Sequence, residues 1–467
     1  MRPPILISLI GAFGFAGCAD EAPPLAHALA SRQLVVATVN SPVTLYEDAD
    51  GRYIGLEHDL VTLFAEENGL TVSFVLLPSL ADVLPAVEQR QAHFGAAGIA
   101  AGLVERRGLR PGPPYQAERY EVAFRSGERK PRDVADLAGR RVAVVAGSGA
   151  VENLRAQAVN GTPVAWAEIR TDDGLDLLGK LSDGEIDYVV ARSNLVSMAT
   201  NFYPGIARGF PIGEPAPLAW AFPSTGEAQV LAKAEAFFAR IEKDGTLKRL
   251  LDRYFGHVDR LSPLDVAGLL KKRRTVLPNY RAWFQEAERL TGIDWRLLAA
   301  LGYQESQWDP LATSPTGVRG LMMLTEDTAD RLKVSDRLDP RQSILAGAQY
   351  LLLLKDTLPA RIAEPDRTFL ALAAYNIGYG HLEDGRILAQ RMGLSPDAWV
   401  DVKRSLPLIA RPEHYRTLPR GFARGNEAVQ LAENVRIYYD ILKRFEPGLA
   451  PPLTAAAPGV TVLRAER

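Results

Sequence analysis

The 467-residue chain is poor in several features, and each shortage excludes a class of protein. It has one cysteine, Cys18, so no disulfide can form within it. Its six histidines show no metal-ligand spacing, and we predict no metal and no other cofactor. The formal net charge is only −2, and the one basic block, at 271–274, is typical of a solvated patch. We therefore expect no nucleic-acid partner.

Long apolar runs are also missing, apart from a short one at 5–15 that follows Arg2. That run has the length and flanking charge of a signal-peptide core and is too short for a mature membrane span. It ends at Phe15-Ala16-Gly17-Cys18, which resembles a bacterial lipobox with phenylalanine in place of the usual leucine. We predict a signal peptide with a lipobox over 1–18 and a tether over 19–32.

Cys18 is the predicted attachment point for lipid, and ordinary cleavage nearby with an incidental cysteine is the alternative. Ala19, rather than aspartate, follows this cysteine. By analogy with Gram-negative lipoproteins, that favours a periplasmic protein whose lipid anchor lies in the inner face of the outer membrane.

Residues 33–257 alternate apolar runs with amphipathic segments. Strands are expected at 34–39 and 72–76, with a helix at 55–65 between them, and the pattern restarts at 140–145. This alternation predicts an α/β domain with a mainly parallel sheet in two lobes. A charged, helix-prone join is expected at 258–278. The Pro/Ala-rich end, 448–467, is predicted to be disordered.

Glu305 stands out in the C-terminal part because it lies on the apolar face of a predicted helix over 293–306. Asp294 is a good N-cap, and the buried stripe runs through Leu298 and Leu301 to Glu305. Burial and the nearby helix C-terminus both raise the pKa of a carboxyl group. A raised pKa suits an acid that holds a proton near neutral pH and then donates it, whereas a lone helical glutamate is usually solvated or paired with arginine.

Two further segments carry glycines that allow tight turns or close backbone approach. One is 314–325, a turn that leads into the apolar run containing Met322 and Met323. The other is 374–381, where Tyr375 and Asn376 would be held at a helix end. Taken singly, methionines in an apolar run indicate core, and Gly-Tyr-Gly indicates a helix stop.

Together and in this order, Gln304-Glu305-Ser306, Gly317 to Thr325 and Ala374 to His381 resemble the lysozyme-like domain of soluble-type lytic murein transglycosylases. The resemblance covers about 279–447 and implies a mainly α fold that binds peptidoglycan strands. It implies that Glu305 is the single catalytic acid/base. The substrate-binding residues that it implies are Gln304, Ser306, Met322, Met323, Tyr375 and Asn376.

The chain departs from that family at two places. Val318 stands where alanine is usual, and Leu431 stands where many relatives carry a tyrosine ahead of the last motif, 433–439. Tyr438 is the candidate replacement for that tyrosine.

Most glycosidases use two carboxylates, but no second acid has a motif context equivalent to that of Glu305. Asp309, followed by proline, is typical of a turn. A single carboxyl suits a reaction in which the substrate supplies the nucleophile. In the family this is the C6 hydroxyl of N-acetylmuramic acid, giving 1,6-anhydromuropeptides from the β-1,4 bond to N-acetylglucosamine without hydrolysis. The alternative chemistry is a muramidase with water as nucleophile.

The 33–257 domain resembles the family-3 periplasmic solute-binding fold through 55–60, Glu105-Arg106 and 184–187. The resemblance places Asp59, Arg106 and Arg192 in a ligand cleft, with Arg106 as a clamp for a ligand carboxylate. Arg192 replaces an acid that often binds the ligand amino group, which favours a small anionic ligand or a peptide fragment. Surface ion pairing of these arginines is the alternative.

The enzyme hypothesis makes the N-terminal domain a ligand-responsive modulator of peptidoglycan cleavage. A different class remains open, namely a lipid-anchored cell-wall sensor whose C-terminal domain only grips glycan. An intact Glu305 on an apolar stripe favours the enzyme.

Overall fold

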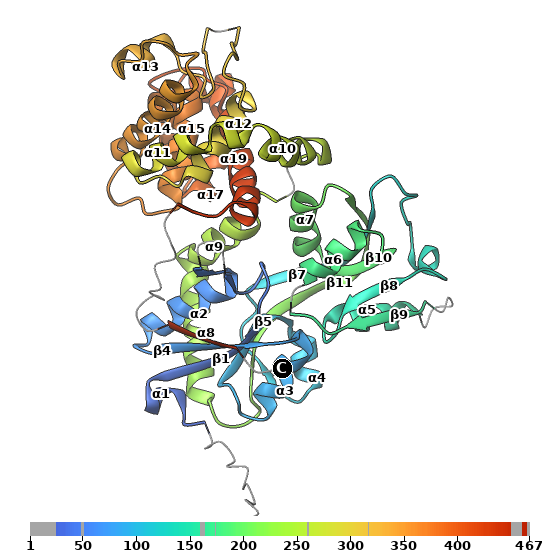
Figure 1. The fold of residues 1–467 in the computed structure, drawn as a ribbon. Coiled ribbons are helices and arrows are strands. Elements are labelled where there is room, and N and C mark those ends of the chain that lie inside the picture. Colours follow the sequence, from blue (N-terminus) through green and yellow to red (C-terminus); the bar gives the residue numbers. More distant parts are fainter. Residues whose placement is uncertain are drawn as a thin grey trace, which may run out of the picture.

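The computed structural model describes residues 25–47, 51–158, 164–172, 174–258, 261–315, 317–449 and 460–464. It consists of an α/β domain followed by a helical domain (Figure 1), which confirms the predicted fold class. The predicted signal peptide and lipobox, and the tether up to residue 24, lie outside the described residues. Within the described ranges, no helix combines the length and apolarity needed to cross a bilayer.

The first lobe of the α/β domain is built on three parallel strands whose side chains are buried on both faces. Val36 of the middle strand pairs with Phe74 on one side and Phe94 on the other, and β5 is buried along its whole length. Such two-sided burial is the usual environment of parallel strands. The elements are α1 (Ala28–Ser31), β1 (Gln33–Val39), β2 (Tyr46–Glu47), β3 (Tyr53–Ile54), α2 (Leu56–Glu67), β4 (Thr71–Leu77), α3 (Val83–Glu88), β5 (Phe94–Ala100), α4 (Ala101–Arg106), β6 (Arg110–Pro111), α8 (Ala228–Lys243) and α9 (Thr246–Phe255).

The second lobe continues the same sheet, because two long antiparallel strands run through both lobes. These are β7 and β11, which pair from Arg125↔Ile206 to Gln116↔Leu218. With β12 (Val460–Arg464) at one edge, the strand order is β12-β4-β1-β5-β11-β7-β10-β8-β9. The elements are β7 (Gln116–Arg125), β8 (Val142–Val145), α5 (Gly149–Ala158), β9 (Trp166–Ile169), α6 (Gly174–Ser182), β10 (Tyr188–Arg192), α7 (Ser193–Phe202) and β11 (Ile206–Phe222).

The C-terminal domain is helical, and its long last helix α19 contacts both α12 and α15. The expected join is part of this domain, because Val266 and Leu269 of α10 are buried in its core. The elements are α10 (Pro263–Thr275), α11 (Arg281–Thr291), α12 (Trp295–Ser306), α13 (Glu326–Arg331), α14 (Pro340–Thr357), α15 (Asp366–Ile377), α16 (Tyr379–Arg391), α17 (Trp399–Ser405), α18 (Pro412–Tyr415) and α19 (Gly425–Phe445).

The predicted disorder at the end of the chain is wrong for five residues. They form β12 (Val460–Arg464), which pairs in parallel with β4, the outer strand of the first lobe (Figure 1). Val462 opposes Phe74 and packs against the core of that lobe. A hydrophobic alternation and an unpaired sheet edge account for the strand. Residues 450–459 and 465–467 lie outside the described residues.

Ion pairs join the two domains where α9 and the short segment after it meet α19. His257 Nε2 lies 2.7 Å from Asp440 Oδ2, and Arg436 Nη1 lies 3.3 Å from Asp252 Oδ2. His257 and Arg436 are buried. Helix α12 and the sheet domain are therefore linked through α19.

Candidate active site

Helix α12 carries Glu305 in its last turn, and its N-terminus is capped as predicted. The Asp294 carboxylate accepts a hydrogen bond of 2.8 Å from the Arg296 backbone N–H. Leu298 and Leu301 are fully buried. The helix ends at Ser306, and the next residue, Gln307, has a left-handed φ of 53°. The predicted stripe of Leu298, Leu301 and Glu305 therefore faces the interior of the domain.

Burial raises the pKa of Glu305 to about 8. Burial is the only cause of this shift, so no charged group in the described part of the chain stabilises the carboxylate. At pH 7 the group is therefore mostly protonated, as expected for a proton donor. Asp309, the other acid nearby in sequence, is exposed, and its Oδ1 accepts a hydrogen bond of 2.9 Å from Leu311 N in a turn.

Tyr375 lies beside Glu305 at the end of α15. Burial, and then the charge of Glu305, raise the pKa of its phenol. The hydroxyl donates a 2.8 Å hydrogen bond to the Met322 carbonyl oxygen, and the ring lies 5.3 Å from that of Tyr350. This bond fixes the 314–325 turn to α15. The other two predicted segments, the 314–325 turn and the end of α15, thus meet beside Glu305.

Ser306 and Gln304 flank the acid and are held by other segments. Ser306 Oγ donates to the Leu321 carbonyl oxygen at 2.8 Å, which ties α12 to the turn. Gln304 Oε1 accepts a 3.1 Å hydrogen bond from Asn434 Nδ2 of α19. Asn376 is exposed, next to Tyr375.

The turn itself requires left-handed backbone at Gly320 and Met323. A Cβ at Gly320 (φ 81°) would lie 1.8 Å from the Arg337 carbonyl oxygen, so no side chain fits there. Arg337 Nη1 also donates to the Gly317 carbonyl oxygen at 3.0 Å. Met323 has φ 48° and is half-buried, consistent with a side chain at the edge of the site.

Two predicted substrate-binding residues, Met322 and Tyr438, have buried side chains and do not lie at the edge of the site. The Met322 side chain is fully buried and lies against Gly302 and Gly347, so only its backbone carbonyl serves the site. Tyr438 is also buried, and its ring centroid lies 4.9 Å from that of Tyr303. Tyr303 is two residues before Glu305, about 200° around the helix, so Tyr438 packs on the opposite side of α12.

Three further residues shape the site and were not predicted from the sequence, namely Ser343, Tyr350 and Asn434. Ser343 Oγ accepts a 3.1 Å hydrogen bond from Met322 N and anchors the turn to α14. Tyr350 and Asn434 contact Tyr375 and Gln304, as above. Of these three, only Asn434 could have been found from the sequence, because it belongs to the last motif, 433–439.

Of the three residues predicted for an N-terminal ligand cleft, Arg106 and Arg192 lie between the lobes, whereas Asp59 lies elsewhere. Asp59 accepts hydrogen bonds from Tyr254 Oη at 2.6 Å and Arg253 Nη1 at 3.0 Å, at the side of the lobe covered by α9. Arg106 pairs with Glu152 of the second lobe, with Nε 3.1 Å from Oε1. Arg192 instead reaches Gly98 of the first lobe.

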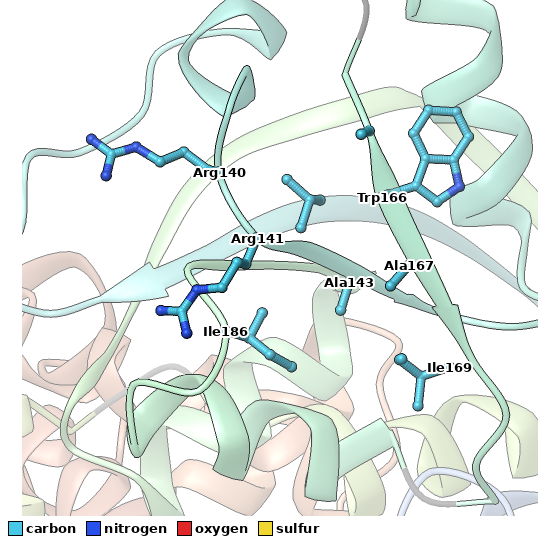
Figure 2. Close-up of a pocket in the computed structure, with 9 residues that line it drawn as sticks. Arg140, Arg141, Ala143, Trp166, Ala167, Ile169 and Ile186 are labelled. Carbon is cyan, nitrogen blue, oxygen red and sulfur yellow. The ribbon is translucent and has the colours of Figure 1, made fainter.

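A separate shallow pocket of about 330 Å³ lies beside β8 and β9 (Figure 2). Trp166, Ile169 and Ile186 line it with Arg140 and Arg141, and it contains none of the predicted site residues. Over the described ranges, no group of three or more His, Cys, Asp or Glu side chains is arranged to hold a metal ion.

Comparisons with known proteins match both domains. Residues 34–257 match the model of bacterial extracellular solute-binding proteins, family 3, and residues 282–392 match the transglycosylase SLT domain. A membrane-bound lytic murein transglycosylase F of Nitrosospira multiformis is 53% identical over 416 residues, 89% of this chain and 86% of the relative. One of Methylobacillus flagellatus is 44% identical over 450 residues, 96% of this chain and 95% of the relative.

Solved structures that resemble the N-terminal domain include an ancestral arginine-binding protein bound to arginine. It has 21% sequence identity and a TM-score of 0.44, and the match covers 48% of this chain and 98% of that one.

A two-lobed domain joined to a helical domain with a half-buried glutamate of raised pKa defines a lytic transglycosylase that carries a solute-binding domain. At this identity and coverage, the chain belongs to the membrane-bound lytic murein transglycosylase F family. It is an enzyme that acts on peptidoglycan glycan strands.

Proposed function

We propose that Glu305 is the single catalytic acid and base of this lytic transglycosylase. Its carboxyl group protonates the glycosidic oxygen between N-acetylmuramic acid and N-acetylglucosamine, and the C4 hydroxyl of N-acetylglucosamine leaves. The C6 hydroxyl of the muramic acid then attacks C1, assisted by the acetamido group of the same sugar. The Glu305 carboxylate takes the proton from that hydroxyl. The product is a 1,6-anhydromuropeptide, and no water is consumed.

The observation that carries this proposal is the pKa of about 8 that burial gives to Glu305. A group with this pKa is protonated at the start of the reaction and accepts a proton back once ionised. No charged neighbour contributes to the shift, which fits a mechanism without a second carboxylate. Tyr375, Gln304, Ser306, Met323 and Asn376 are proposed to position the sugars around it.

Mass spectrometry of the products from purified peptidoglycan tests the mechanism. The intact chain should give muropeptides lighter by one water than hydrolysed ones, and Glu305→Gln should give none while keeping its fold and glycan binding. Reducing-end products would make the enzyme a muramidase. Retained activity in Glu305→Gln would remove Glu305 from the mechanism, and no products from either protein would favour the sensor alternative.

We further propose that the N-terminal domain modulates the enzyme through a small anionic ligand or a peptide fragment. Its support is the two-lobed fold and the interlobe positions of Arg106 and Arg192. Turnover of peptidoglycan would be measured with and without free stem peptide. An unchanged rate and an unchanged scattering profile at saturating peptide would exclude this modulation.

The relatives' name, membrane-bound, supports attachment of this chain to the envelope. We propose that Cys18 carries the lipid and holds the enzyme at the inner face of the outer membrane. Labelling of cells with a palmitate analogue should mark the intact chain and not Cys18→Ser. Equal labelling of both, or recovery of the intact chain in the inner-membrane fraction, would refute the assignment.

A further inference from the structure

Arg192 reaches across the space between the two lobes of the α/β domain. It is the last residue of β10 in the second lobe, where it pairs with Tyr120 of β7. Its side chain extends to the first lobe, where Nη1 donates a 3.2 Å hydrogen bond to the carbonyl oxygen of Gly98 in β5. The guanidinium group therefore belongs to one lobe and is bound by the other.

The first lobe is shaped to receive this group at Gly98. The residue has φ 63°, and a Cβ there would lie 1.9 Å from Arg192 Nη1, so the guanidinium occupies the place of a side chain. Behind it, Glu57 Oε1 accepts a 2.8 Å hydrogen bond from Gly98 N. Only 1% of Glu57 is exposed, and the positive charge of Arg192 acts to lower its pKa against the larger effect of burial.

A second buried carboxyl group faces Arg192 from the strand that connects the lobes. Glu118 of β7 is 6% exposed, and Arg192 is the charged group that most favours its ionised form against burial. Glu118 Oε2 also accepts hydrogen bonds from Ser193 Oγ at 3.1 Å and Asn194 N at 3.4 Å, the two residues that follow Arg192. Arg192 thus donates to one carbonyl oxygen and favours the ionised forms of two buried acids.

The other polar contacts between the lobes are more exposed. Arg106, paired with Glu152, has a side chain 56% exposed, and Arg170, paired with Asp82, one 63% exposed. Exposed ion pairs of this kind contribute little to stability. Contact of the lobes also brings Gly147 against Ala81. Arg192 is partly buried, so its link between the lobes is the least exposed of these three.

We infer that the interlobe space contains a binding site for a guanidinium group, and that the chain fills this site with its own Arg192. The lobes then close without any solute, and free cationic amino acids are excluded because the position is taken. An incoming ligand of the N-terminal domain has to displace Arg192 from Gly98 before the position becomes available. This inference does not depend on the reaction at Glu305.

The distance between the lobes tests the inference by double electron–electron resonance. Spin labels would be placed on the exposed positions of Gln89→Cys in the first lobe and Ala156→Cys in the second, in a full chain carrying Cys18→Ser. The chain with Arg192 should give one short distance. Arg192→Ala should give a longer and broader distribution, and millimolar methylguanidinium should restore the short distance, whereas the same concentration of tetramethylammonium should not.

The matched control is Arg155→Ala, because Arg155 pairs with Glu168 inside the second lobe. It should leave the distance unchanged. Calorimetric titration should detect methylguanidinium binding to Arg192→Ala and not to the chain with Arg192. An unchanged distance in Arg192→Ala, or failure of methylguanidinium to bind or restore it, would overturn the inference. If Arg192→Ala does not fold, recovery of its folding by methylguanidinium supports the inference. Arg192→Gln is then the second variant, and it refutes the inference if its distance is not longer and methylguanidinium has no effect on it.

Discussion

Replacing Glu305 by glutamine is expected to stabilise the folded chain, and the gain should grow with pH. The pKa of Glu305 is about 8 in the folded chain against an ordinary value of 4.5. Below pH 4.5 the group is protonated in both the folded and the unfolded chain, so its raised pKa does not lower the free energy of unfolding. As pH rises through 4.5 toward 8, the unfolded chain ionises first, so the stability present at low pH is progressively lost.

The magnitude follows from these two pKa values. Linkage gives a loss of about 1 kcal/mol at pH 5, about 3 kcal/mol at pH 7 and about 5 kcal/mol at pH 9. Glutamine does not ionise, so the Glu305→Gln variant escapes this loss. Burying the glutamine amide costs the same free energy at every pH. This cost therefore does not affect how the difference in unfolding free energy between the two proteins changes with pH.

Scanning calorimetry of both full chains from pH 5 to pH 9 measures this difference, through the transition of the helical domain. Glu326→Gln, at an exposed position in the first turn of α13, is the control for loss of a carboxyl group. A difference between Glu305→Gln and the unmodified chain that stays flat, or falls with pH, would show that the folded state holds an ionised and compensated Glu305. The acid role would then lose its physical basis.

Three other outcomes are expected. Release of muropeptides from sacculi should decline above about pH 8, because ionised Glu305 has no proton to donate; a rate that keeps rising beyond that pH contradicts this. Tyr375→Phe should lower stability by about 1 kcal/mol through loss of the bond to Met322, and should lower kcat; urea unfolding and turnover measure both, and an unaltered kcat would make Tyr375 purely structural. Gly320→Ala should abolish activity and lower Tm, since its Cβ overlaps the Arg337 carbonyl oxygen, whereas Gly317→Ala meets no atom within 4 Å and should be milder; equal effects would argue against the close contact.

Local sequence patterns predicted the parts of the molecule that depend on short-range geometry. Helical spacing placed Glu305 on the buried stripe, and Asp294 capped the helix as expected. Met322 and Tyr438 were named from the family resemblance, and the places of their side chains did not follow from such patterns. Left-handed backbone at Met323 and the packing of α19 on the far side of α12 decide where those side chains lie. Neither is encoded in residue spacing.

Long-range pairing limited the prediction for the N-terminal domain. Arg192 meets Gly98 across 94 positions of sequence, and Arg106 meets Glu152 across 46. The sequence shows where these arginines stand in the chain but not which group each of them contacts. The strand 460–464 was missed for a similar reason, because its partner β4 lies at the other end of the chain.

The pairing of β12 with β4 means that the sheet of the first lobe is completed from the far end of the chain. Residues that follow the helical domain in sequence cover the outer edge of β4, and Val462 packs against the core of that lobe. The covered edge presents no open row of backbone groups to a strand of another molecule. The last residues of the chain therefore protect the first domain from edge-to-edge association.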